Sequence, residues 1–126
     1  MSAQRLTTPE LHWAAGFLDG EGSFGFRMSP RKNGSTIGSL TVAAKQVYLP
    51  SLEKLQRLFG GGISGYTRYT GHSINSWALS SARAAAVMMT LYVLLSPYRQ
   101  GQIRSALSQW RAYKGRSLRA NMWEKH

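Results

Sequence analysis

The spacing of apolar and polar residues predicts an alternation of helices and strands along the chain. The segment Thr8-Pro9-Glu10 reads as a helix start, with a capping hydroxyl, proline at the first helical position and an acid in the first turn. We expect this helix over residues 9–18, ended by the glycines at 20 and 22. Residues 23–29 then alternate with the period of a strand. One face of that strand carries Phe24, Phe26 and Met28, and the other carries Ser23, Arg27, Ser29 and Arg31.

The rest of the chain continues the alternation. In chain order we expect a turn (32–35), a strand (37–46), a helix (50–59), a hairpin around Gly71 (63–70 and 73–79), a helix from Ser80 or Ser81 to about residue 95, and a final helix (98–113). Pro97 separates the last two helices. The basic segment from Lys114 onward is expected to be a less ordered tail.

The resulting order, α-β-β-α-β-β-α-α, predicts an α+β fold with a curved four-stranded antiparallel sheet and helices on one face. That face should bury Phe24, Phe26, Met28, Leu40 and Val42. The opposite face should be polar and basic. A solvated face is the usual alternative for an antiparallel sheet. None of its residues is acidic, however, which favours a nucleic-acid groove; the expected face residues are Arg27, Arg31, Thr41, Lys45, Tyr66 and Arg68.

Net charge narrows the class of partner. The 126-residue chain has 16 lysines and arginines against 5 acids, a net charge of +11. Such an excess favours a polyanion, most commonly nucleic acid, over a membrane surface, because the basic residues are not gathered on one amphipathic stretch. The absence of cysteine excludes disulfides and thiolate metal sites. The longest apolar run is too short to cross a bilayer, and the first ten residues lack an apolar signal region.

Two of the few acids stand apart from the others. Asp19 and Glu21 lie at the C-terminal end of the first predicted helix, where the helix dipole disfavours negative charge. Carboxylate oxygens are the ligands that Mg²⁺ prefers, and it typically takes one or two of them together with substrate phosphates. The pair therefore predicts a divalent metal site. Structural roles, as caps or as partners of arginine, remain an equal alternative at this point.

The same helix carries little side-chain bulk on part of its surface, at Ala14, Ala15, Gly16 and Gly20. Small residues allow two helices to pack with their backbones close together. If the partner is a second copy of this helix, two Glu21 side chains approach each other at a two-fold axis. A tight helix crossing within one chain is the alternative.

These residues carry a family resemblance. The stretch from Ala14 to Gly22, AAGFLDGEG, resembles the LAGLIDADG motif of homing endonucleases, and so do the following Ser23-Phe24, the later LEKL at 52–55 and the order of elements over roughly residues 9–113. The resemblance implies an endonuclease domain over 1–113 and a basic tail over 114–126. With one motif copy, it implies a homodimer that cleaves both strands of a long, roughly palindromic DNA site.

The resemblance also assigns roles. Glu21 takes the place of the family's second acid, a metal ligand that is more commonly Asp, and Asp19 the place of the first, more often structural. It implies Glu21, Gly20 and Asp19 around Mg²⁺, for which Mn²⁺ or Ca²⁺ can substitute in binding. Gln46, or Ala44 in a gap-free alignment, matches a polar residue near the end of the second strand. Arg99 matches a basic residue before the last helix, so the implied catalytic set is Glu21, Gln46 and Arg99. The implied dimer interface is Ala14, Ala15, Gly16, Asp19 and Gly20.

Strand parity gives the expected DNA contacts: Ser23, Gly25, Arg27, Ser29, Arg31, Ser39, Thr41, Lys45, Tyr66, Arg68 and Thr70. The leading interpretation is therefore an intron-encoded, metal-dependent endonuclease without a small-molecule cofactor or membrane attachment. It would work inside a prokaryotic cell or an organelle. The alternative is a protein of the same fold that binds without cutting, such as an intron RNA maturase or a DNA-binding regulator; a structural RNA-binding protein would not explain the paired acids.

Overall fold

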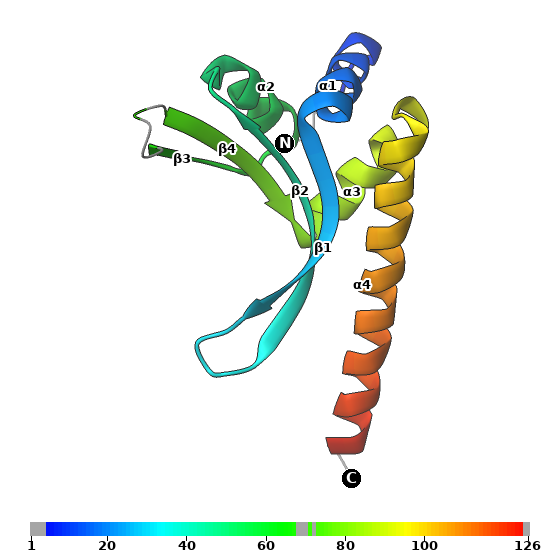
Figure 1. The fold of residues 1–126 in the computed structure, drawn as a ribbon. Coiled ribbons are helices and arrows are strands. Elements are labelled where there is room, and N and C mark those ends of the chain that lie inside the picture. The colour runs from blue at the N-terminus through cyan, green and yellow to red at the C-terminus, as the bar shows by residue number, and fades with distance from the viewer. Residues whose placement is uncertain (1–4, 68–70, 72, 125–126) are drawn as a thin grey trace.

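The computed structural model describes residues 5–67, 71 and 73–124, and it has the predicted order of elements (Figure 1). One short 3-10 helix, η1, is added between the last two helices. The elements are α1 (Thr8–Glu21), β1 (Gly22–Pro30), β2 (Thr36–Gln46), α2 (Leu49–Phe59), β3 (Gly62–Thr67), β4 (Ser73–Ser80), α3 (Ser81–Leu91), η1 (Tyr92–Leu94) and α4 (Pro97–Glu124).

The four strands form one antiparallel sheet in the order β1-β2-β4-β3. The sheet is strongly curved, and α4 runs alongside β1 and continues past it (Figure 1). One face of the sheet is buried because its alternate residues are apolar: Leu40, Val42 and Trp77 are fully covered. The helices supply the other half of this core through Leu18, Leu52, Leu55, Met88 and Leu91. The α+β architecture with one open sheet face is confirmed.

Helix α1 begins and ends differently from the prediction. Its cap is Thr7, one residue earlier than expected, in a capping box: Glu10 N donates to Thr7 Oγ1 at 3.2 Å, and Thr7 N donates to Glu10 Oε1 at 2.8 Å. The helix continues to Glu21 instead of ending near residue 18. Of the two glycines expected to end it, Gly22 is the C-terminal cap, whereas Gly20 lies within the helix. A glycine within a helix costs only about 1 kcal/mol, and core packing compensates for that.

The burial expected for β1 is only partly correct. Leu40 and Val42 are fully buried and Phe24 is 5% exposed, but Phe26 is only partly buried and Met28 is 46% exposed. The β1–β2 hairpin extends away from the helices toward its tip (Figure 1), and Met28 lies near the tip end of β1. Phe26 packs instead against Tyr113 of α4, with ring centroids 5.8 Å apart.

The last two helices also depart from the prediction. Helix α3 ends at Leu91, ahead of η1, and α4 begins at Pro97 and runs for 28 residues to Glu124. The predicted end of this helix at residue 113 is wrong. No proline follows residue 113 to break the helix, and Gly115 is accommodated within it. Lys114, placed at the start of the tail, instead lies over the Trp110 ring at 4.1 Å. Within the described ranges, no helix combines the length and the apolar character needed to cross a membrane.

Candidate active site

The site forms where α1 turns directly into β1. Gly22 is the first residue after the helix, and its N–H donates to the Leu18 carbonyl oxygen. A Cβ on Gly22 would lie 2.7 Å from that same oxygen, so only glycine allows the chain to turn this closely. The turn leaves Glu21, the last helical residue, exposed beside the first residue of the sheet.

Asp19 is engaged within the chain. Its Oδ1 accepts a hydrogen bond from the backbone N–H of Ser96 at 2.8 Å. Ser96 precedes α4, so the carboxylate lies at the positive end of a long helix dipole. The hydrogen bonds from Ser96, with a smaller contribution from the charge of Arg99, lower the pKa of Asp19. The acid that looked costly at the end of α1 is thus stabilised by the start of α4, which supports its structural role.

Arg99 makes the reciprocal contact. Its Nε donates to the backbone oxygen of Asp19 at 2.9 Å, which satisfies one of the carbonyls left unpaired at the C-terminal end of α1. The cation therefore lies at the negative end of the α1 dipole, the helix end that also carries Glu21. Arg99 is 80 residues from Asp19 in the sequence. We name this junction, formed by Asp19, Ser96 and Arg99, the α1–α4 clasp.

The second strand distinguishes Gln46 from Ala44. Ala44 pairs with Gly22 and is 2% exposed, so it contributes a buried methyl group to the core. Gln46 lies two residues further on, is partly exposed and pairs with Asn75 at the end of β2. Of these two residues, only Gln46 offers a polar group near the α1–β1 turn.

The metal-ligating groups of a single chain are few. Within the described residues, no cluster of three or more His, Cys, Asp or Glu side chains could hold a metal ion. Asp19 already accepts hydrogen bonds at one carboxylate oxygen and at its carbonyl oxygen. This leaves the Glu21 carboxylate and the exposed Gly20 backbone at the end of α1. Such a set fits a hard cation that takes its other oxygens from a substrate phosphate or a second chain.

The open face of the sheet carries the residues expected to contact DNA. Ser23, Arg27, Arg31 and Lys45 are exposed, and Gly25, Ser29, Ser39 and Thr41 are partly buried on the same side. Tyr66 lies within β3, where its backbone pairs with Ile74 of β4. Arg68 and Thr70 lie outside the described residues. No acid occurs in any of the four described strands, so the charge of this face is entirely positive.

Strand β4 adds polar residues that the sequence analysis left out. Ser76 pairs with Lys45 and with Ser64 of β3, and Ser80 pairs with Thr41. Directly paired residues share one face of a sheet, so Ser64, Ser76 and Ser80 extend the open face. The alternation around the buried Trp77 and Leu79 was a sequence signal for this assignment.

The small residues of α1 divide into two groups. Ala14 and Ala15 are 0% and 2% exposed and belong to the chain's own core, so the structure does not offer them to a partner. Gly16 and Gly20 are exposed, and a Cβ on either would meet nothing within 4 Å. The expected interface on α1 therefore narrows to these two glycines and their exposed neighbours. Asp19, also expected there, is instead partly buried in the α1–α4 clasp.

Comparison with solved structures identifies the fold. The group I intron-encoded homing endonuclease I-CeuI, solved with DNA, matches 90% of this chain with a TM-score of 0.64 and 11% identity. The homing endonuclease I-CvuI, solved with its target in the presence of Ca, matches 76% with a TM-score of 0.60 and 17% identity. The LAGLIDADG meganuclease I-CpaMI, bound to uncleaved DNA, matches 69% with a TM-score of 0.51 and 17% identity.

These matches are structural and partial. The aligned region covers 59% of I-CeuI, 62% of I-CvuI and 29% of I-CpaMI. The chain thus spans about three fifths of the length of the first two proteins. No protein-family model matches the sequence, and no curated protein matches it.

Proposed function

We propose that this chain, which has the fold of the LAGLIDADG homing endonucleases, is a site-specific, metal-dependent DNA endonuclease that acts as a homodimer. The observation that carries the proposal is the position of Glu21. It is the exposed carboxylate at the point where α1, the basic open face and the α1–α4 clasp meet. A carboxylate is costly at a helix C-terminus and beside bound phosphates unless a cation lies between them.

Each residue of the site has a distinct role in this proposal. Glu21, with the Gly20 carbonyl, would hold Mg²⁺, which supplies Lewis-acid stabilisation of the phosphate and a water of lowered pKa. Gln46 would orient the attacking water. Arg99 keeps its Nη2 group free of hydrogen bonds within the described part of the chain, so this group is available to a phosphate oxygen. Asp19 would act through the α1–α4 clasp and not as a ligand.

A homodimer is proposed because one chain has too few carboxylates at the site. Cutting both DNA strands requires a metal-binding carboxylate at each strand, and a single chain offers only Glu21, since Asp19 is hydrogen-bonded to Ser96. Two copies meeting through the exposed Gly16 and Gly20 would bring two Glu21 side chains to a two-fold axis and join two open faces into one DNA groove. The open faces would then read a long, roughly palindromic site. Encoding by an intron, and action inside a prokaryotic cell or an organelle, belong to the same proposal.

Cleavage is tested by incubating the protein with a randomised double-stranded DNA library, with Mg²⁺ or with EDTA, and sequencing the cut ends. We expect discrete cuts that require Mg²⁺ and that fall at least a hundredfold in Glu21→Gln, since removal of one stabilising group at a reacting centre costs about that much. Glu53→Gln is the matched control, because Glu53 is an exposed acid on α2. Cleavage that survives both EDTA and Glu21→Gln would refute the proposal. Binding without cleavage would favour a maturase or regulator.

The open face is tested by DNA affinity. Replacing Arg27 or Lys45 with Ala should weaken binding of the selected site by about 1–3 kcal/mol, because each loses a contact to a base or a phosphate. Arg57→Ala on α2 is the control, since Arg57 is an exposed arginine of a helix and not of the sheet. The measurement is a fluorescence-anisotropy titration at several salt concentrations. Equal losses for the three variants would show that the sheet is not the reading face.

A further inference from the structure

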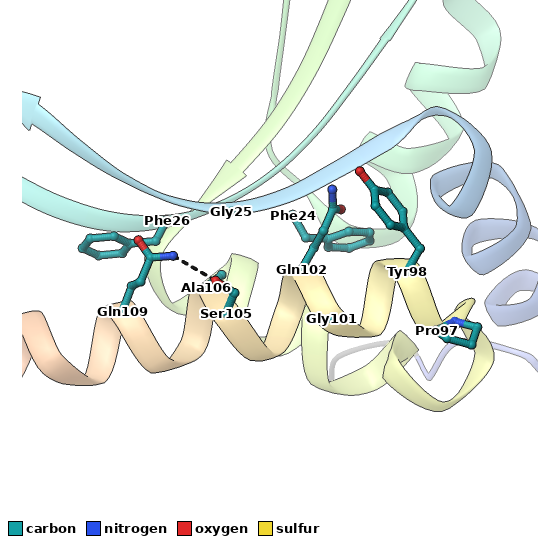
Figure 2. Close-up of a pocket in the computed structure, with 10 residues that line it drawn as sticks. All are labelled: Phe24, Gly25, Phe26, Pro97, Tyr98, Gly101, Gln102, Ser105, Ala106 and Gln109. Atoms are coloured by element: carbon teal, nitrogen blue, oxygen red, sulfur yellow. Dashed lines mark hydrogen bonds between the residues drawn. The ribbon is translucent and has the colours of Figure 1, made fainter.

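Gln102 contacts the guanidinium of Arg99 directly. It lies one helical turn after Arg99 on α4, and its Oε1 accepts a hydrogen bond from Arg99 Nη1 at 3.0 Å. Both side chains are partly buried. Gln102 also lines a groove of about 600 Å³ between β1 and α4. Figure 2 shows its side chain rising from α4 toward β1, beside Tyr98 and on the side of the groove nearer to α1.

The hydrogen bond to Gln102 is one of three that hold Arg99 in place. Its Nε is bound by the Asp19 carbonyl oxygen, its Nη1 by Gln102, and its backbone N–H donates to Ser96 Oγ at 3.4 Å. A guanidinium is planar, so two acceptors at Nε and Nη1 fix both its plane and its direction. The remaining nitrogen, Nη2, then points in one defined direction. Gln102 is neutral and accepts this bond without cancelling the positive charge of Arg99.

We propose that Gln102 is a positioning residue that orients Arg99 toward the scissile phosphate. The inference rests on the proposed nuclease function and extends it, because neither the family resemblance nor the charge pattern assigns a role to Gln102. Its function is to reduce the conformations open to a long, flexible side chain before the substrate arrives. Gln102 acts through Arg99 and has no contact of its own with the reacting atoms.

Two other glutamines of α4 provide the contrast. Gln100 points elsewhere, with its Nε2 donating to the Tyr92 carbonyl oxygen at 2.8 Å. Gln109 lines the same groove as Gln102 but donates to Ser105 Oγ at 3.1 Å (Figure 2). A direct contact between the groove and DNA would involve Gln102 and Gln109 alike. A positioning role would involve Gln102 alone, so Gln109→Ala is the matched control.

The kinetic test compares single-turnover cleavage rates and dissociation constants on the selected site. We expect Gln102→Ala to lower the rate about tenfold, the effect of losing one hydrogen bond to a charged group. The dissociation constant should stay within about twofold, and Gln109→Ala should match wild type. In an Arg99→Ala background, Gln102→Ala should have no further effect. A rate loss equal to that of Gln109→Ala, or an undiminished loss without Arg99, would overturn the proposal.

A second readout does not depend on cleavage. The Arg99 Nε–Hε group gives an NMR signal that Arg99→Lys identifies by its disappearance. In the free protein, Gln102→Ala should speed hydrogen exchange at this group by about tenfold, because the guanidinium gains freedom to leave the Asp19 carbonyl. Gln109→Ala should not change it. If the wild type cuts no DNA, the proposed nuclease function fails, but the exchange rate still decides whether Gln102 fixes the Arg99 side chain. Unchanged exchange in Gln102→Ala would overturn the positioning role.

Discussion

Asp19 and Glu21 are separated by one residue, yet they lie in two very different regions of the molecule. Asp19 lies in the α1–α4 clasp, where Ser96 and Arg99 satisfy both of its oxygen-bearing groups. Glu21 lies at the exposed α1–β1 turn, between glycines and beside the basic open face. Two acids of one short segment thus have opposite surroundings. The contrast gives the first acid hydrogen-bond partners within the chain and leaves the carboxylate of the second exposed.

The physical basis of the contrast is an exchange between two helix ends. The C-terminus of α1 carries a partial negative charge and receives the Arg99 cation, while the N-terminus of α4 carries a partial positive charge and receives the Asp19 carboxylate. Each charged group meets the helix end of opposite sign. Glu21 takes no part in this exchange, so its charge remains available to a cation.

The largest expected difference between Asp19 and Glu21 is in their contribution to the free energy of unfolding. Asp19→Ala should lower the free energy of unfolding by about 1–2 kcal/mol, because the Ser96 N–H loses a charged acceptor and the α1–α4 clasp opens on one side. Glu21→Ala should change it by no more than about 0.5 kcal/mol, as is usual for exposed side chains. Urea unfolding measures both. Equal effects of the two substitutions would show that the two acids do not differ in structural role.

The pH dependence of stability tests whether the hydrogen bonds between Ser96 and the Asp19 carboxylate cause this difference. The pKa of Asp19 is lowered by the Ser96 hydrogen bonds, so its contribution is fully present above its unfolded pKa of about 3.9 and is lost as pH falls through the lower folded pKa. Asp19→Asn should therefore flatten the loss of stability below about pH 4. Some slope should remain, because hydrogen bonds from Thr7 also lower the pKa of Glu10. An unchanged slope would contradict the role of the α1–α4 clasp.

The smallest expected effect concerns the exposed glycines. Gly16→Ala should stabilise the isolated chain by about 0.5–1 kcal/mol, because alanine favours the helix and its Cβ meets nothing within 4 Å. If two copies pack through this surface, the same methyl group should weaken their association. Sedimentation equilibrium and urea unfolding separate the two effects. Stabilisation with unchanged self-association would place the dimer contact elsewhere.

Much of the fold was predictable from short-range patterns. Period-two alternation predicted β1, and the predicted end of the next helix at residue 59 is confirmed by α2. Predictions failed where a distant contact outweighed a local signal. Gly20 did not end α1, which continues to Glu21 ahead of Gly22, because Ala14, Ala15 and Leu18 hold that helix in the core. Met28 remained exposed because the β1–β2 hairpin extends away from the described helices (Figure 1), which the alternation within one strand cannot reveal.

For the site, the sequence by itself determined two sets of candidates: the two acids and the basic character of one sheet face. The family resemblance that the sequence carries added the choice of Gln46 or Ala44. Only the tertiary structure separated Asp19 from Glu21 and buried Ala44 while leaving Gln46 partly exposed. It alone brought Ser96, Arg99 and Gln102 to the end of α1. The reason is physical: residue type and spacing fix what a side chain can donate, accept or bury. Which partner satisfies it depends on contacts made 77 to 80 residues away.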